Sequence, residues 1–435
     1  MTPANQHPLA GPAGMTWPFV NAIQPRISYA QPTTKIERVL LVATIALFPL
    51  EDMLPLVRGV SSSFILFLLL AGYCLIKRPS STIKTAGHPV FIAAYVFLMV
   101  GALIESLHPY ADYSELSRIA LMVGGGVLLA TMCRDKKALR ACLVAFVIVG
   151  LWMAIVLIIT MYSGLSGASA TDFDEASKVR EGLLESNPFL GNANSMAFMT
   201  GQGVVVALVM ALHEKKSWRR YALFGIIILG IVATFLPLSR SGIVITLVSC
   251  ATVMFVHKGQ KLRVILAAIV LGIAILAWVP DVVFARLTFS TKSHDGKQEA
   301  RAAIYTAAIE HAPEYVITGV GTGNFWRLWG YNHGWRTGGG TLGAHNSPIA
   351  VTLYWGIAGL AAFILVIVQA YRCLPRWCSN DPLALSLLGI GLSMLLLLNV
   401  THNLKLKEFS IGLGLMVAAR TIWPNKFCEP VTGAV

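Results

Sequence analysis

The stretch that decides the fold class is SPIAVTLYWGIAGLAAFILVIVQAY, residues 347–371. It contains no Lys, Arg, Asp or Glu, and a helix that crosses a bilayer needs about 20 mostly apolar residues. The whole chain follows this pattern, with 56% hydrophobic and 13% charged residues, whereas soluble proteins carry about 25% charged residues. The sequence therefore predicts an all-α polytopic membrane protein.

Similar apolar segments recur along the chain. We predict about twelve transmembrane helices, at 37–52, 60–76, 88–107, 117–133, 139–162, 192–213, 219–237, 241–257, 262–280, 347–371, 382–400 and 405–421. A flexible cytoplasmic tail is expected over 1–36, and a second cytoplasmic tail over 422–435. Helices 1–9 then occupy 37–280 and helices 10–12 occupy 347–421. The long segment 281–346 contains the helical pattern KQEARAAIYTAAIEH and several tryptophans, so it is predicted to form a partly helical outer cap.

The basic residues indicate the orientation. With both termini in the cytoplasm, 21 of the 34 Lys and Arg residues fall inside, and six of the remaining 13 lie in segment 281–346. Long loops translocate regardless of charge, so the informative comparison is 21 against 7. This bias also explains the net charge of +13 without a nucleic-acid partner. The chain has no Walker motif for ATP and no second acidic cluster beside DFDE (172–175), so we expect an already activated donor and no metal or cofactor.

A histidine stands just before the tenth predicted helix, in GGGTLGAHNSP (338–348). We predict Ser347 as the helix N-cap and Pro348 as the first helical residue. The helix dipole disfavours a charged imidazolium there, so neutral His345 could accept a proton as a general base. The helix end could also bind an anion through its free N–H groups. The alternative is an interfacial histidine that only hydrogen-bonds the loop.

Three arginines lie on the predicted outer side, against the charge bias. Arg240 is in TFLPLSRSGIVITL, Arg301 is on the first turns of the cap helix, and Arg180 is in the loop before the sixth helix. Arginine binds phosphate through two parallel hydrogen bonds, and a diphosphate carries enough charge for two or more arginines. The alternatives are that Arg240 reaches lipid headgroups, that Arg301 lies on a solvated helix face, and that Arg180 belongs to a flexible acidic loop.

Four asparagines and one glycine-rich segment each allow a functional and a purely structural interpretation. Asn187, Asn192, Asn194 and Asn346 could hydrogen-bond sugar hydroxyls or cap helices, and capping is favoured for at least one of the first three. The segment GVGTGNF (319–325) departs from the GxGxxG spacing of a nucleotide loop, so we predict a turn there.

Taken together, these segments resemble the bacterial O-antigen ligases, within the wider group of O-antigen ligases and polymerases. The resemblance rests on about twelve spans, a large late outer loop, the SRSG turn, SNPFLGNAN, and AHNSPIAVTLYWGIAGL after EARAAIY and EYVITGVGTGNF. It covers most of residues 37–420. The resemblance implies a GT-C-like architecture in the bacterial inner membrane, with both termini cytoplasmic and the active site periplasmic.

The resemblance also implies an activity. Such ligases transfer a glycan from undecaprenyl diphosphate to the lipid A–core, without metal and with inversion at the anomeric carbon. His345 matches the family's essential histidine, Arg240 and Arg301 match its essential arginines, and Arg180 is a further candidate. The partners would be the lipid-linked glycan, the lipid A–core and membrane lipids. His345 would take the acceptor proton or, alternatively, bind the diphosphate or position the acceptor.

Other functions stay open at this point. An O-antigen polymerase or a protein O-oligosaccharyltransferase would share the donor chemistry and differ in the acceptor. A transporter of lipid-linked sugars or another anion is the rival from a different class. Its ionisable groups should lie near the membrane midplane, whereas the predicted span centres are almost free of them.

Overall fold

The computed structural model describes residues 32–47, 62–108, 113–162, 179, 193–257, 305–306, 308–322, 336–337, 340–341, 346–374, 381–399 and 407–423. Helices make up nearly all of this part of the chain, which confirms the prediction of a helical polytopic membrane protein. The longer helices are α1 Lys35–Leu47, α2 Ser62–Lys77, α3 Pro79–Ala86, α4 Pro89–Leu107, α5 Ser114–Met132, α6 Lys136–Leu157, α9 Ala193–His213, α10 Ser217–Phe235, α11 Arg240–Val256, α17 Ser347–Arg372, α18 Pro382–Leu398 and α19 Lys407–Ile422.

Short elements complete the described chain. The π-helix η3 Ile158–Tyr162 extends α6, and α15 Ala312–Tyr315 lies in the segment predicted as the cap. Strands β1 Arg336–Thr337 and β2 Gly340–Thr341 pair antiparallel in the same segment. The predicted cap therefore contains a small β pair as well as helix.

The number of membrane spans is only partly settled. Within the described residues, six helices are long and apolar enough to cross a membrane, or seven if the bent pair α2–α3 counts as one span. Three shorter apolar helices, α11, α18 and α19, accompany them. The ninth predicted span, 262–280, lies outside the described residues. Twelve spans and a GT-C-like architecture thus stay predictions.

Helix α3 was not foreseen from the sequence. It follows α2 after a bend of 111°, and Pro79 is its first residue. A proline has no N–H to continue the preceding helix and pushes the residue before it out of the helical region. Arg78, at the corner, accordingly has φ −139°.

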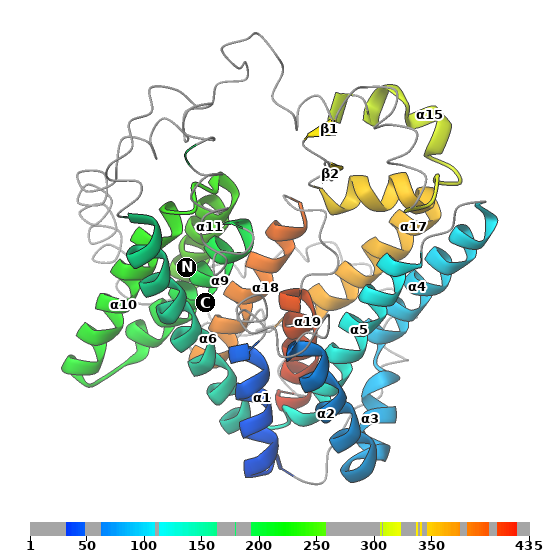
Figure 1. Ribbon diagram of the computed structural model, residues 1–435. Helices are drawn as coiled ribbons and strands as arrows, with labels where there is room; N and C mark the ends of the chain where they lie inside the picture. Colours follow the sequence, from blue (N-terminus) through cyan, green and yellow to red (C-terminus); the bar gives the residue numbers. More distant parts are fainter. Residues whose placement is uncertain are drawn as a thin grey trace, which may run out of the picture.

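The helices form two groups that meet in the middle of the molecule (Figure 1). In one group α9 packs against α6, α10, α11 and α18. It is the central helix of this group, because 83% of its most apolar stretch is buried inside the protein. In the other group α17 packs along α4 and α19 packs along α5. Glycines bring helices together in the first group: a Cβ on Gly203 of α9 would lie 2.8 Å from the Cα of Gly150 of α6.

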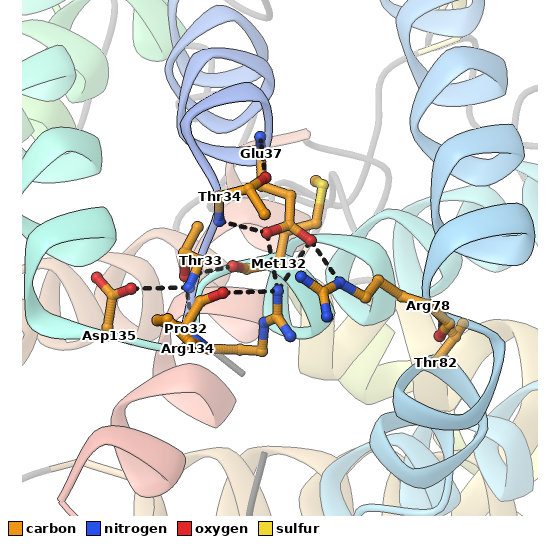
Figure 2. Close-up of polar contacts among 9 residues, drawn as sticks. All are labelled: Pro32, Thr33, Thr34, Glu37, Arg78, Thr82, Met132, Arg134 and Asp135. Atoms are coloured by element: carbon orange, nitrogen blue, oxygen red, sulfur yellow. Dashed lines mark hydrogen bonds and ion pairs between the residues drawn. The ribbon is translucent and has the colours of Figure 1, made fainter. Parts of the chain in front are cut away.

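Buried ion pairs join three helix ends at one face of the bundle (Figure 2). The Glu37 carboxylate of α1 accepts hydrogen bonds from Arg78 Nε at 2.9 Å and from Arg134 Nη2 at 2.8 and 2.9 Å. The amide of Thr34 adds a fourth bond at 2.6 Å. The side chains of Glu37 and Arg134 are almost completely buried, and burying charge is tolerated only with such partners. We call the face that contains this cluster the lower face; α15, β1 and β2 lie at the opposite, upper face (Figure 1).

Candidate active site at the upper face

Arg240 is the first residue of α11 and lies at the upper face. The Ser239 side chain caps the helix by accepting a hydrogen bond from the Gly242 amide at 3.2 Å. Leu238, just before the cap, is buried and has φ +54°, the left-handed region that costs a residue with a side chain about 1–3 kcal/mol. Arg240 is half-buried. Its side chain thus starts from the N-terminal end of a helix, and the positive end of the helix dipole and the charge of the arginine both attract an anion.

Helix α17 is broken, and this corrects the prediction of one continuous span over 347–371. Gly356 has φ +64° and ψ −162°, a conformation that essentially only glycine adopts. The first half of α17 (residues 347–355) lies across the upper face, and the remainder descends beside α4 (Figure 1). Hydropathy alone missed the break because neither half contains a charged residue up to Tyr371.

The segment predicted to be a turn after α15 holds this break in place. The amides of Val320 and Gly321 donate to the carbonyls of Leu353 and Tyr354, each at 2.9 Å. The Ile357 amide donates in return to the carbonyl of Val316 at 2.7 Å. These bonds replace intrahelical bonds that the break removes. Gly319 and Gly321 both have positive φ, and residues 323–325 of the predicted turn lie outside the described residues.

A buried acid supports the same break. Glu105 of α4 is completely buried, and its Oε1 atom accepts the Thr322 amide at 2.7 Å and the Trp355 indole N–H at 3.0 Å. Its Oε2 atom has no hydrogen-bond partner among the described residues. Glu105 was not among the predicted site residues, although a lone acid inside an apolar span is costly and usually functional.

Asn346 is the N-cap of α17, and the prediction that Ser347 caps it is wrong. The Asn346 carboxamide oxygen accepts the Ile349 amide at 3.0 Å, and its Nδ2 donates to the Asn399 carbonyl at 3.1 Å. Ser347 is instead the first helical residue, and it is completely buried. Of the two roles predicted for Asn346, the structure shows capping, together with a link to the end of α18.

Helix packing places Arg240 and Asn346 at the same face. Ser249 of α11 bonds Ser393 of α18 at 2.8 Å, and the two helices run antiparallel. At 1.5 Å per residue, Arg240 lies about 13 Å above this bond and Asn399 about 9 Å above it. Packed helices lie about 8–10 Å apart. The start of α11 and the Asn346–Asn399 contact are therefore neighbours at the upper face.

Other predicted site residues fall outside the part of the chain that the structure describes. These are His345, Arg301, Arg180, Asn187 and Asn192. Asn194 is the second residue of α9, so it lies at the start of a helix. For these residues, the roles in binding and catalysis stay predictions.

A comparison with protein families decides the class. Residues 225–364 match the family model described as O-antigen ligase. The chain carries an O-antigen ligase domain. A search of curated proteins gave no match. The match confirms the resemblance: this membrane protein carries a domain of the O-antigen ligase family of enzymes.

The ligase domain contains several of the upper-face features described above. Arg240, the turn at 319–322, Asn346 and the break at Gly356 all lie within residues 225–364. Glu105, which supports that break, lies on α4 outside the matched region. The break in α17 therefore depends on a helix that the domain match does not include.

Proposed function

We propose that this enzyme transfers an O-antigen glycan from undecaprenyl diphosphate to the lipid A–core, at the periplasmic side of the inner membrane. The main support is that the matched domain spans Arg240 and the first half of α17, two features at one face of the bundle. We assign the upper face to the periplasm because Lys and Arg are concentrated in the loops predicted to be cytoplasmic, which join the helices at the opposite face.

The proposed reaction is a single displacement. The acceptor hydroxyl oxygen attacks the anomeric carbon from the face opposite the diphosphate, the carbon–oxygen bond to the diphosphate breaks, and the configuration inverts. His345 takes the hydroxyl proton. Arg240 and Arg301 hold the diphosphate and stabilise the charge that it gains as it leaves. In this proposal Arg180 assists in binding the donor, and the two arginines supply the positive charge that a metal provides in other transferases.

Purified protein tests this proposal when it is given undecaprenyl-diphosphate glycan and lipid A–core, with and without EDTA. We expect product from the wild type in both conditions and none from His345→Ala. Arg240→Ala should raise the KM for the donor about 10- to 100-fold, the range for a lost hydrogen bond to a charged group. Arg219→Ala, which removes an exposed arginine of α10 near the lower face, is the matched control.

The acceptor distinguishes a ligase from a polymerase and from a protein O-oligosaccharyltransferase, because all three use the same kind of donor. Product only with a second lipid-linked glycan would assign a polymerase, and product only with an acceptor protein would assign an O-oligosaccharyltransferase. If labelled donor crosses the membrane of vesicles that contain the protein and no new glycosidic bond forms, the assignment as a transferase is contradicted and a transporter is favoured.

A further inference from the structure

The face of α4 that meets α17 is shaped around one side chain, Trp355. Phe97, Gly101 and Glu105 are spaced by four residues, so they lie in one row on α4. The Phe97 ring meets the Trp355 ring edge to face with centroids 5.0 Å apart. A Cβ on Gly101 would lie only 3.0 Å from the indole ring, so glycine provides the space that the ring occupies. Glu105 then accepts the indole N–H at 3.0 Å.

Trp355 is the residue immediately before the break in α17. Fixing its ring fixes the direction in which the first half of α17 leaves the break, because Gly356 by itself is free to rotate. The same oxygen of Glu105 also accepts the Thr322 amide at 2.7 Å, so one atom joins α4, α17 and the segment that follows α15. This half-helix leads back to Asn346 and, one residue further, to His345.

We propose that Glu105 is a positioning residue for catalysis: through Trp355 and Thr322 it sets the orientation of the first half of α17, the half-helix that Asn346 caps. This inference rests on the proposed function, because it assigns the orientation of that site. Glu105 does not touch the substrate. Both of its hydrogen bonds use Oε1, so an amide oxygen in that position satisfies the same two donors.

The experiment compares Glu105→Gln, Glu105→Ala and Trp355→Phe in the transfer assay. Trp423→Phe is the matched control, because the Trp423 indole is also buried and donates to a carboxylate, Asp381 Oδ2 at 3.2 Å, at the lower face. We expect kcat to fall about 10- to 100-fold in Glu105→Ala and about tenfold in Trp355→Phe, as for lost hydrogen bonds to a charged group. Glu105→Gln and Trp423→Phe should stay within about threefold of the wild type.

Two further readouts separate positioning from general stability. The KM for the donor should not change in any of these variants, because Arg240 lies on α11 and not on α17. Hydrogen–deuterium exchange of amides 349–355 should speed up in Glu105→Ala and Trp355→Phe and stay unchanged in Trp423→Phe.

Each outcome decides the inference. Equal kcat in wild type, Glu105→Ala and Trp355→Phe would overturn it, and so would an inactive Glu105→Gln, which would make Oε2 or its charge the essential feature. If Glu105→Ala does not fold, the pair Trp355→Phe and Trp423→Phe still decides. A wild type that transfers nothing would refute the proposed function instead, and the exchange measurement would then test the link between Glu105 and α17 by itself.

Discussion

Replacing Gly356 by alanine should disturb the bend in α17 and leave the rest of the bundle intact. A Cβ at this position would collide with the carbonyl oxygen of Ile317, and the backbone at φ +64°, ψ −162° excludes residues other than glycine. Alanine is also the strongest helix former. The variant should therefore favour a straighter α17, in which the first half no longer lies across the upper face.

The size of the effect follows from the contacts at the break. The backbone conformation costs alanine about 1–3 kcal/mol. Moving away from Ile317 breaks three hydrogen bonds, Val320 to Leu353, Gly321 to Tyr354 and Ile357 to Val316, each of which contributes about 1 kcal/mol net. These three bonds hold the bend and do not add to the penalty on it, so the strained backbone disfavours the native bend by about 1–3 kcal/mol, or roughly 5- to 150-fold in its population relative to a straightened helix.

The assay is glycan transfer by detergent-solubilised protein, together with exchange of amides 349–355. We expect kcat to fall roughly 5- to 150-fold, with a smaller change in the KM for the donor. Gly225→Ala in α10 is the control, because a Cβ there meets nothing within 4 Å and the helix gains about 0.5–1 kcal/mol. Wild-type transfer by Gly356→Ala would refute the view that the break positions the site.

Three further predictions concern other parts of the bundle. Gly242→Ala forces a Cβ into Ala197 where α11 meets α9; it should cost about 1–3 kcal/mol and raise the KM for the donor, measured by thermal unfolding and transfer kinetics. Glu37→Ala removes the carboxylate that pairs with buried Arg134 and partly buried Arg78 and should lower stability by about 3–5 kcal/mol, with kcat of the folded fraction unchanged. Burial raises the pKa of Asp135, but hydrogen bonds from the α6 and Thr33 amides outweigh it, so the pKa lies below its ordinary 3.8. Its stabilisation is thus present above that value and disappears as pH falls through the lowered pKa; Asp135→Asn should flatten the acid limb of a plot of melting temperature against pH.

Much of the site's chemistry could be predicted from single residues. Arg240 is recognisable because a positive charge in a tight turn on the outer side opposes the charge bias of the loops. The helix start at Asn346 is recognisable from the sequence NSP, although the cap falls one residue earlier than predicted. These features are local, so the chemistry of a few neighbouring residues is enough to find them.

Glu105 shows what local chemistry does not supply. It is separated by 250 residues from Trp355 and by 217 from Thr322, and no periodicity in the sequence relates the three. Gly356 is similarly hidden, because a glycine in an apolar helix ordinarily permits close packing, and only the backbone of 316–321 shows that it ends one helix and starts another.

The sequence by itself determined the membrane class, the helical architecture and the ligase family, because apolar length, charge bias and short motifs are properties of neighbouring residues. The tertiary structure alone decided that α17 is bent, that the segment after α15 fills the bend, and that an acid on α4 supports it. Those features depend on hydrogen bonds between segments far apart in the chain, and such bonds form only after the helices have packed.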